Sequence, residues 1–187
     1  MQRRKYLQAL MASGLGTAMI TGTGSAKSDP KREIKVRDYN FSADNLEAKI
    51  WMDDMDISKE STAELGLQLK NTIGEDITLL QSCTNSVNSI EGTRNRGNVK
   101  AVLVGRMNTW KDKNGRWFAS EDELYPDRPD QQTAATLSKG ESYRMQYQLW
   151  GHSGSPYLPP GTYTFKRDII VEGVTETLSL DITVSTK

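Results

Sequence analysis

The C-terminal third of the chain carries the clearest structural pattern: LSKGES at residues 137–142, YRMQYQL at 143–149, LPPGTYTF at 158–165 and LSLDITV at 178–184. Apolar and polar residues alternate in the last three runs, so each is expected to be a strand with one buried and one exposed face. The alternating apolar positions are Tyr143, Met145, Tyr147, Leu149, Tyr163, Phe165, Leu178, Leu180, Ile182 and Val184. Strands of this kind need a second layer to cover their apolar faces.

Two turns between these runs sharpen the prediction. Glu172-Gly173 separates the final two runs, and glycine supplies the positive φ that a tight hairpin requires. Pro159-Pro160-Gly161 precedes Tyr163, which is either an ordinary core residue or a tyrosine corner whose hydroxyl bonds a nearby backbone group. Together with the strands, these turns predict an all-β fold, an immunoglobulin-like antiparallel β-sandwich of two sheets.

Further strands are expected around residues 33–37, 48–52, 65–69, 77–80 and 99–107. The polar turn between the third and fourth of these makes either a hairpin or a crossing from one sheet to the other. Asn114-Gly115 between apolar runs is a strong hairpin signal. Exposed loops are expected at the acidic run 53–56 and at two polar stretches, residues 85–98 and 119–136.

The N-terminus resembles an export signal. Residues 1–26 begin with Arg3-Arg4-Lys5 in a pattern similar to the twin-arginine signature, continue with a short apolar stretch and end in small residues. The apolar stretch is too short and too polar to span a membrane. We therefore expect a cleaved signal peptide at 1–26, a linker at 27–32 and one sandwich domain at 33–187, with an extracytoplasmic location and no stable membrane span.

Composition narrows the functional classes. The chain has 24 basic and 24 acidic residues, and residues 1–26 hold three of the basic ones and no acidic one, so the remainder carries a net charge of −3. This balance gives no electrostatic case for nucleic acid or an anionic membrane. The single cysteine, Cys83, is expected to be buried and inert. No pattern of residues indicates a metal site, a catalytic site or a cofactor.

The single histidine limits the possible chemistry. His152 lies in Gly151-His152-Ser153-Gly154-Ser155, which is not the nucleophile motif of hydrolases, and any serine–histidine site would have to use it. We expect an exposed loop histidine and no enzymatic activity. If the domain binds a partner through its loops, the candidate contact residues are Arg94, Arg96, His152 and Tyr157.

Two tryptophans flank the Asn114-Gly115 turn. Trp110 and Trp117 make either a binding platform or, as such residues more commonly do, part of the core and rim of a sandwich.

Several segments together resemble the intracellular proteinase inhibitor (BsuPI) family over roughly residues 63–184. They are LQLKNT at 67–72 with DITL at 76–79, NGRWFAS at 114–120, LSKGES at 137–142, LWG at 149–151 and PGTYT at 160–164. Lys139 stands where the family usually has proline. The resemblance implies an immunoglobulin-like domain and, for the founding member, inhibition of a serine protease.

Two features depart from that family, and no functional residue can be carried over one by one. An export signal does not fit an intracellular protein, and the arginine-bearing stretch at 85–98 has no counterpart that we know. The expected function is therefore an exported binding module whose partner is another protein, possessing either protease-inhibitor activity or a structural role in assemblies of the cell surface. The sequence leaves the oligomeric state open.

Overall fold

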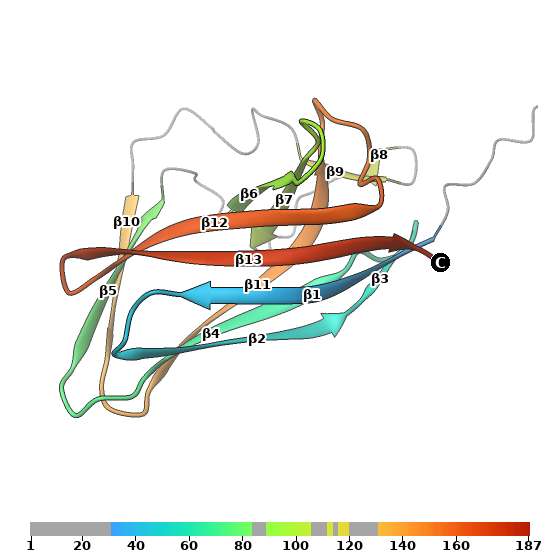
Figure 1. Ribbon diagram of the computed structural model, residues 1–187. Coiled ribbons are helices and arrows are strands. Elements are labelled where there is room, and N and C mark those ends of the chain that lie inside the picture. The colour runs from blue at the N-terminus through green and yellow to red at the C-terminus, as the bar shows by residue number, and fades with distance from the viewer. Residues whose placement is uncertain (1–30, 84–88, 106–111, 114–115, 120–130) are drawn as a thin grey trace, which may run out of the picture.

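A computed structural model describes residues 31–83, 89–105, 112–113, 116–119 and 131–187. These residues form strands joined by turns and contain no helix, so the prediction of an all-β fold is confirmed (Figure 1). In chain order the strands are β1 (Arg32–Phe41), β2 (Leu46–Asp54), β3 (Asp56–Ile57), β4 (Glu64–Asn71), β5 (Ile77–Cys83), β6 (Ser89–Arg94), β7 (Lys100–Gly105), β8 (Asp112–Lys113), β9 (Arg116–Ala119), β10 (Gln131–Leu137), β11 (Ser142–His152), β12 (Gly161–Val171) and β13 (Val174–Thr186).

The strands follow one hydrogen-bonded path that almost returns to its start. The order is β2-β4-β11-β7-β6-β12-β13-β1-β3. Off this path, β5 pairs with β12 and carries β10 on its other side, while β9 pairs with β11 and carries β8. One residue separates β2 from β3, yet β2 pairs with β4 while β3 pairs with β1. This single stretch of chain therefore touches both ends of the path and gives the sheet a barrel-like closure. All pairings are antiparallel except that of β9 with β11, which is parallel.

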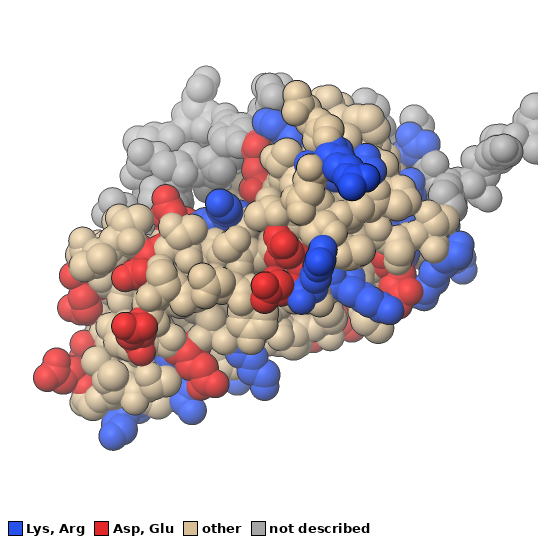
Figure 2. Space-filling view, viewed as in Figure 1, with Lys and Arg blue, Asp and Glu red and all other residues tan. Residues whose placement is uncertain are grey.

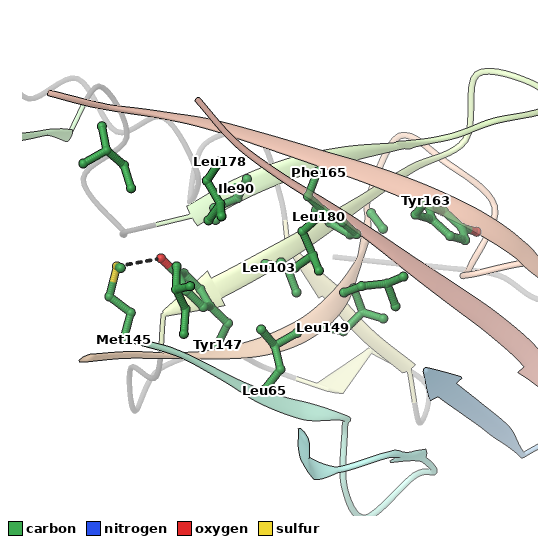
Figure 3. Packing of buried hydrophobic residues seen from close by; sticks show 14 of the residues in the cluster. Leu65, Ile90, Leu103, Met145, Tyr147, Leu149, Tyr163, Phe165, Leu178 and Leu180 are labelled. Atoms are coloured by element: carbon green, nitrogen blue, oxygen red, sulfur yellow. Dashed lines mark hydrogen bonds between the residues drawn. The ribbon is translucent and has the colours of Figure 1, made fainter. Parts of the chain in front are cut away.

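A single large cluster of apolar side chains fills the interior. Figure 3 shows side chains from β4, β7 and β11 pointing toward side chains from β6, β12 and β13. The largest fully buried ones include Tyr147, Tyr163 and Phe165, whereas Trp150 belongs to a second, smaller cluster with Val102, Val104 and Ala119. The alternating apolar residues of the C-terminal third, apart from the half-buried Tyr143, thus form much of the core, as their spacing predicts.

Two predicted hairpins are present. Val171 pairs with Val174 across the β12–β13 turn, where Glu172 has φ 50° and Gly173 φ 81°, the positive values of a tight two-residue turn. Lys113 pairs with Arg116, so β8 and β9 form the hairpin expected around residues 114–115, which themselves lie outside the described residues. The turn after β4 does not make a hairpin, because β4 pairs with β2 and β11 whereas β5 pairs with β10 and β12.

Three segments expected to be loops contain strands. Within 85–98, β6 occupies 89–94 and buries Ile90, and within 119–136, β10 begins at Gln131. In the acidic run, residues 53 and 54 lie on β2 and residue 56 on β3. These predictions were wrong because polar composition does not prevent pairing where side chains point to solvent. The expected linker is also one residue too long, since β1 begins at Arg32. Cys83 ends β5, but its side chain lies outside the described residues.

Glycine lets an aromatic ring lie directly across a strand in two places. A Cβ at Gly92 would stand 2.4 Å from the ring of Phe165, the residue paired with it on β12. A Cβ at Gly66 would stand 2.1 Å from the indole of Trp51, its partner on β2. Aromatic side chains covering an opposed glycine help to fix strand register. Gly92 therefore explains how polar β6 packs against the core.

Within the described part of the chain, no helix has the length and apolar character needed to cross a membrane.

Candidate functional site

The β11–β12 loop, residues 153–160, and the β6–β7 turn, residues 95–99, lie at one end of the fold, which we call the loop end (Figure 1). Hydrogen bonds connect both to neighbouring strands: the backbone N–H of Lys100 on β7 donates to Ser155 Oγ at 3.0 Å, and that of Asn95 donates to the carbonyl of Thr162 on β12 at 2.9 Å. All four residues predicted from the sequence lie at or beside this end. Only one of them, Arg96, is exposed.

A buried arginine anchors the β11–β12 loop. The Arg32 guanidinium donates from Nε to the carbonyl of Leu158 at 2.9 Å and from Nη2 to that of Tyr157 at 3.3 Å. Its Cζ atom also lies 4.8 Å from the centre of the Tyr157 ring. The side chain is 8% exposed, and it holds Leu158 at φ 35°, a conformation that non-glycine residues rarely adopt. The sequence interpretation missed Arg32 because its position looked like a linker, and no local motif marks it.

Tyr157 belongs to the packed base of the loop rather than to its exposed surface. It is 8% exposed, its ring centre lies 5.0 Å from that of Phe118, and its hydroxyl accepts a hydrogen bond from the backbone N–H of Trp117 at 3.4 Å. Tyr157 was expected to be a loop contact for a partner, but its side chain is buried and not available for one. The ring points inward because it packs against Phe118 of β9.

Tyr163 adopts the tyrosine-corner geometry. Its hydroxyl donates to the carbonyl of Pro159 at 2.8 Å, four residues upstream, so the corner interpretation is confirmed. Burial raises the pKa of Tyr163 to about 12, although the positive charges of Arg94 and Arg32 act in the opposite direction. This bond holds the loop at a third backbone carbonyl, in addition to the two that Arg32 binds.

His152 is buried, contrary to the expectation of an exposed loop histidine. It ends β11 and is 2% exposed. Its Nδ1 accepts a hydrogen bond from the backbone N–H of Gly154 at 3.2 Å, while Nε2 lies 3.9 Å from Glu91 Oε1. Glu91 in turn contacts Lys100 Nζ at 3.2 Å. The bond from Gly154 to Nδ1 therefore joins the buried imidazole to the start of the loop.

The two arginines have different positions. Arg94 is half-buried at the end of β6, where a Cβ at Gly161 would lie 2.5 Å from its Nε. Arg96 projects from the β6–β7 turn, which is closed by a 2.9 Å bond from the Arg94 N–H to the carbonyl of Val99 and turns at Gly97 with φ 84°. Arg96 is therefore the predicted contact residue that the structure leaves accessible.

Trp117 lies in the rim of the core rather than on an open platform. It is half-buried, its ring centre is 5.4 Å from that of Trp150 in an edge-to-face arrangement, and its Nε1 donates to the carbonyl of Ser58 at 3.0 Å. These contacts favour the interpretation as core and rim. Trp110 lies outside the described residues.

Charge is distributed unevenly over the face shown in Figure 2. Basic side chains predominate toward the loop end, and acidic side chains are more frequent toward the opposite end, where the β12–β13 hairpin lies. Among the residues described, no group of three or more His, Cys, Asp or Glu side chains is placed to hold a metal ion. What the loop end offers chemically is an ordered surface with basic character.

Comparison of the chain with protein-family models, with curated proteins and with solved structures found no significant match to any of them.

Proposed function

We propose that this chain is an exported, non-catalytic binding module that recognises another protein through its loop end. We further infer that the hydrogen-bonded path divides into the two sheets of an immunoglobulin-like β-sandwich, β2-β4-β11-β7-β6 and β10-β5-β12-β13-β1-β3. Only three residue pairs, from Gly92 to Arg94 on β6, join these two groups along β12. Their apolar faces enclose the core of Figure 3, as the two layers of a sandwich do.

The observation that carries the proposal is the contrast between the base and the tip of the β11–β12 loop. The base is fixed by Arg32 and by Tyr163, which donate to the carbonyls at residues 157, 158 and 159. The tip, at Ser153, Gly154 and Pro156, is exposed. A loop already ordered before binding loses little conformational entropy on association, so its contacts contribute more fully to affinity.

The resemblance to BsuPI domains supports protease inhibition as the form of this binding. An inhibitor of ordinary size covers about 1,600 Å² in total and presents a rigid segment to the enzyme's cleft. The β6–β7 turn spans only residues 95–99, which is short for an extended substrate-like segment, whereas the β11–β12 loop spans 153–160. We therefore assign the cleft contact to the longer loop and a flanking charge contact to Arg96.

A panel of secreted serine proteases tests this assignment with the purified mature domain. Arg96→Ala should weaken inhibition of any enzyme that is inhibited, and Pro156→Asp should weaken it more because it alters the loop tip. Arg144→Ala, an exposed arginine on β11, is the matched control and should have no effect. Full activity of every protease in the presence of the domain would remove inhibition from the proposal.

A structural role at the cell surface is the second candidate, because immunoglobulin-like sandwiches often serve adhesion and assembly. It predicts that the exported protein co-purifies with envelope proteins, whereas a soluble inhibitor remains in the culture supernatant with its protease. Fractionation of cells producing the tagged full chain separates the two.

Export itself has a direct test. Replacing Arg3 and Arg4 together with lysine should stop export through the twin-arginine route, while replacing Lys27 and Lys31 with arginine should not. Continued export of the first variant would refute this route.

A further inference from the structure

We propose that the open edge of β10 is a self-association surface, on which a second copy of this chain pairs antiparallel with the two-fold axis at Ala134. This inference concerns a different surface from the loop end and does not depend on the proposed function.

The four strands that have hydrogen-bonded pairing on one side only, among those described, differ in how they are protected. β3 and β8 are two residues long, and both carry an aspartate. β2 carries charged residues and a register shift between Met52 and Asp54. Short length, charge and bulges are the usual devices that prevent one sheet edge from pairing with another.

β10 has none of these devices. Its seven residues, QQTAATL, include no charge, proline or glycine, and its ladder with β5 runs without a register shift from Gln131 to Leu137. Ala134 and Thr136 are exposed. A flat, uncharged edge of this length is a template for strand addition.

The hydrogen bonds of β5 show which backbone groups of β10 face this edge. The N–H of Thr78 donates to the carboxylate of Glu172 and its C=O accepts from the Glu172 N–H, so both backbone groups of Thr78 face the β12–β13 turn and away from β10. Thr136 is its cross-strand partner and therefore points its own N–H and C=O away from β5. Since successive residues alternate, the same holds for Ala134 and Gln132. Three residues thus offer outward donors and acceptors.

These groups are self-complementary. With the axis at Ala134, each Ala134 faces its copy and each Gln132 faces the other chain's Thr136, so every outward N–H meets an outward C=O and no charged residues are opposed. An isologous contact of this kind needs no second surface. This complementarity favours a second copy over an unrelated strand. Seven paired residues bury less than the roughly 1,200 Å² of a stable interface, so we expect a weak dimer, with a Kd of about 10 μM or higher.

Proline substitution tests the edge without disturbing the fold. Ala134→Pro removes an outward N–H but leaves the bonds to β5, so the variant should stay folded and remain monomeric at concentrations where the full chain dimerises. Ala134→Thr keeps the N–H and should dimerise. Sedimentation equilibrium up to millimolar concentration gives the masses. A wild-type chain that stays monomeric throughout would overturn the proposal.

Cysteine pairing tests the register independently and does not require a proline variant to fold. In a Cys83→Ser background, Ala134→Cys should form an intermolecular disulfide readily, because symmetric Cα atoms in a hydrogen-bonded pair lie about 5.5 Å apart. Thr136→Cys is the matched control: its copy would lie four residues further along the strand, at least about 14 Å away given about 3.4 Å per residue, and should not link. Equal cross-linking of the two variants, or no cross-linking of Ala134→Cys, refutes this pairing.

Discussion

Replacing Gly92 with alanine should destabilise the protein, because the new methyl group would overlap a buried ring. A Cβ at this position would lie 2.4 Å from Cε1, 2.5 Å from Cδ1 and 2.7 Å from Cζ of Phe165. Carbon atoms pack best at about 3.5–4.0 Å, so all three contacts are about an ångström too short. Phe165 is 1% exposed and pairs with Gly92 where β6 meets β12, so the ring cannot move aside without displacing the core.

The expected loss in the free energy of unfolding is about 2–3 kcal/mol. Overpacking a buried site costs about 1–3 kcal/mol and occasionally more, and the separations at Gly92 belong at the upper end. Removing the backbone freedom of glycine returns about 0.5–1 kcal/mol. Urea denaturation measures the difference: with a slope near 2 kcal/mol per molar, the midpoint should fall by about 1 M or more while the slope stays unchanged.

Gly66→Ala provides the matched control. Its Cβ would lie 2.1 Å from Trp51, but Trp51 is only half-buried, so the indole can rotate toward solvent. We expect a loss below about 1 kcal/mol there, given that surface changes of this kind are mild. Adding Phe165→Leu to Gly92→Ala should relieve the overlap, as a double-mutant cycle would show. A loss at Gly92 no larger than that at Gly66 would refute the reasoning.

Three further predictions concern the anchors of the β11–β12 loop. Tyr163→Phe removes the donor to Pro159 and should cost about 1–2 kcal/mol of unfolding free energy. Because the folded pKa of Tyr163 is about 12, above the unfolded value near 10, the wild type should lose stability from pH 10 to 12 while the variant loses less. Parallel pH profiles of the two proteins in thermal melts would contradict this. Arg32→Lys keeps the positive charge but loses the planar guanidinium that donates to two carbonyls. The variant should show faster proteolysis and amide exchange within residues 153–160, and unchanged rates in the β12–β13 hairpin. Exchange in the loop as slow as in the wild type would contradict the anchoring role. Since Nδ1 of His152 accepts from Gly154, the neutral ring should carry its proton on Nε2, which nitrogen NMR of the single histidine can read directly; a proton on Nδ1 would show that this bond is absent.

Alternation and turn chemistry in the sequence were enough for the strongest elements. β12, β13 and the Glu172-Gly173 turn follow from period-two spacing, and Tyr163 follows from the proline and glycine before it. These features are local, so neighbouring residues contain the information. β6 and β10 were missed because their residues are polar, and what makes them strands is a distant partner: Phe165 over Gly92, and β5 beside β10.

The candidate site was located in part for the same reason. The turn bearing Arg96, the end of β11 at His152 and the loop containing Tyr157 do lie at one end of the fold, but His152 and Tyr157 are buried rather than exposed to a partner. Both are drawn inward by contacts from other strands, including Glu91 on β6 and Phe118 on β9. Arg32, from the opposite end of the chain, has no sequence signal that connects it to residues 157–158.

The pairing of β1 with β13 has a consequence for synthesis. Residues 32–41 bond to residues 178–186, so the earliest strand to leave the ribosome acquires this partner only when the last one follows. Such distant pairing slows folding and leaves the apolar side of β1 uncovered during translation. Nascent chains should therefore depend on chaperones until termination, and a ribosome stalled before codon 178 should hold a protease-sensitive product.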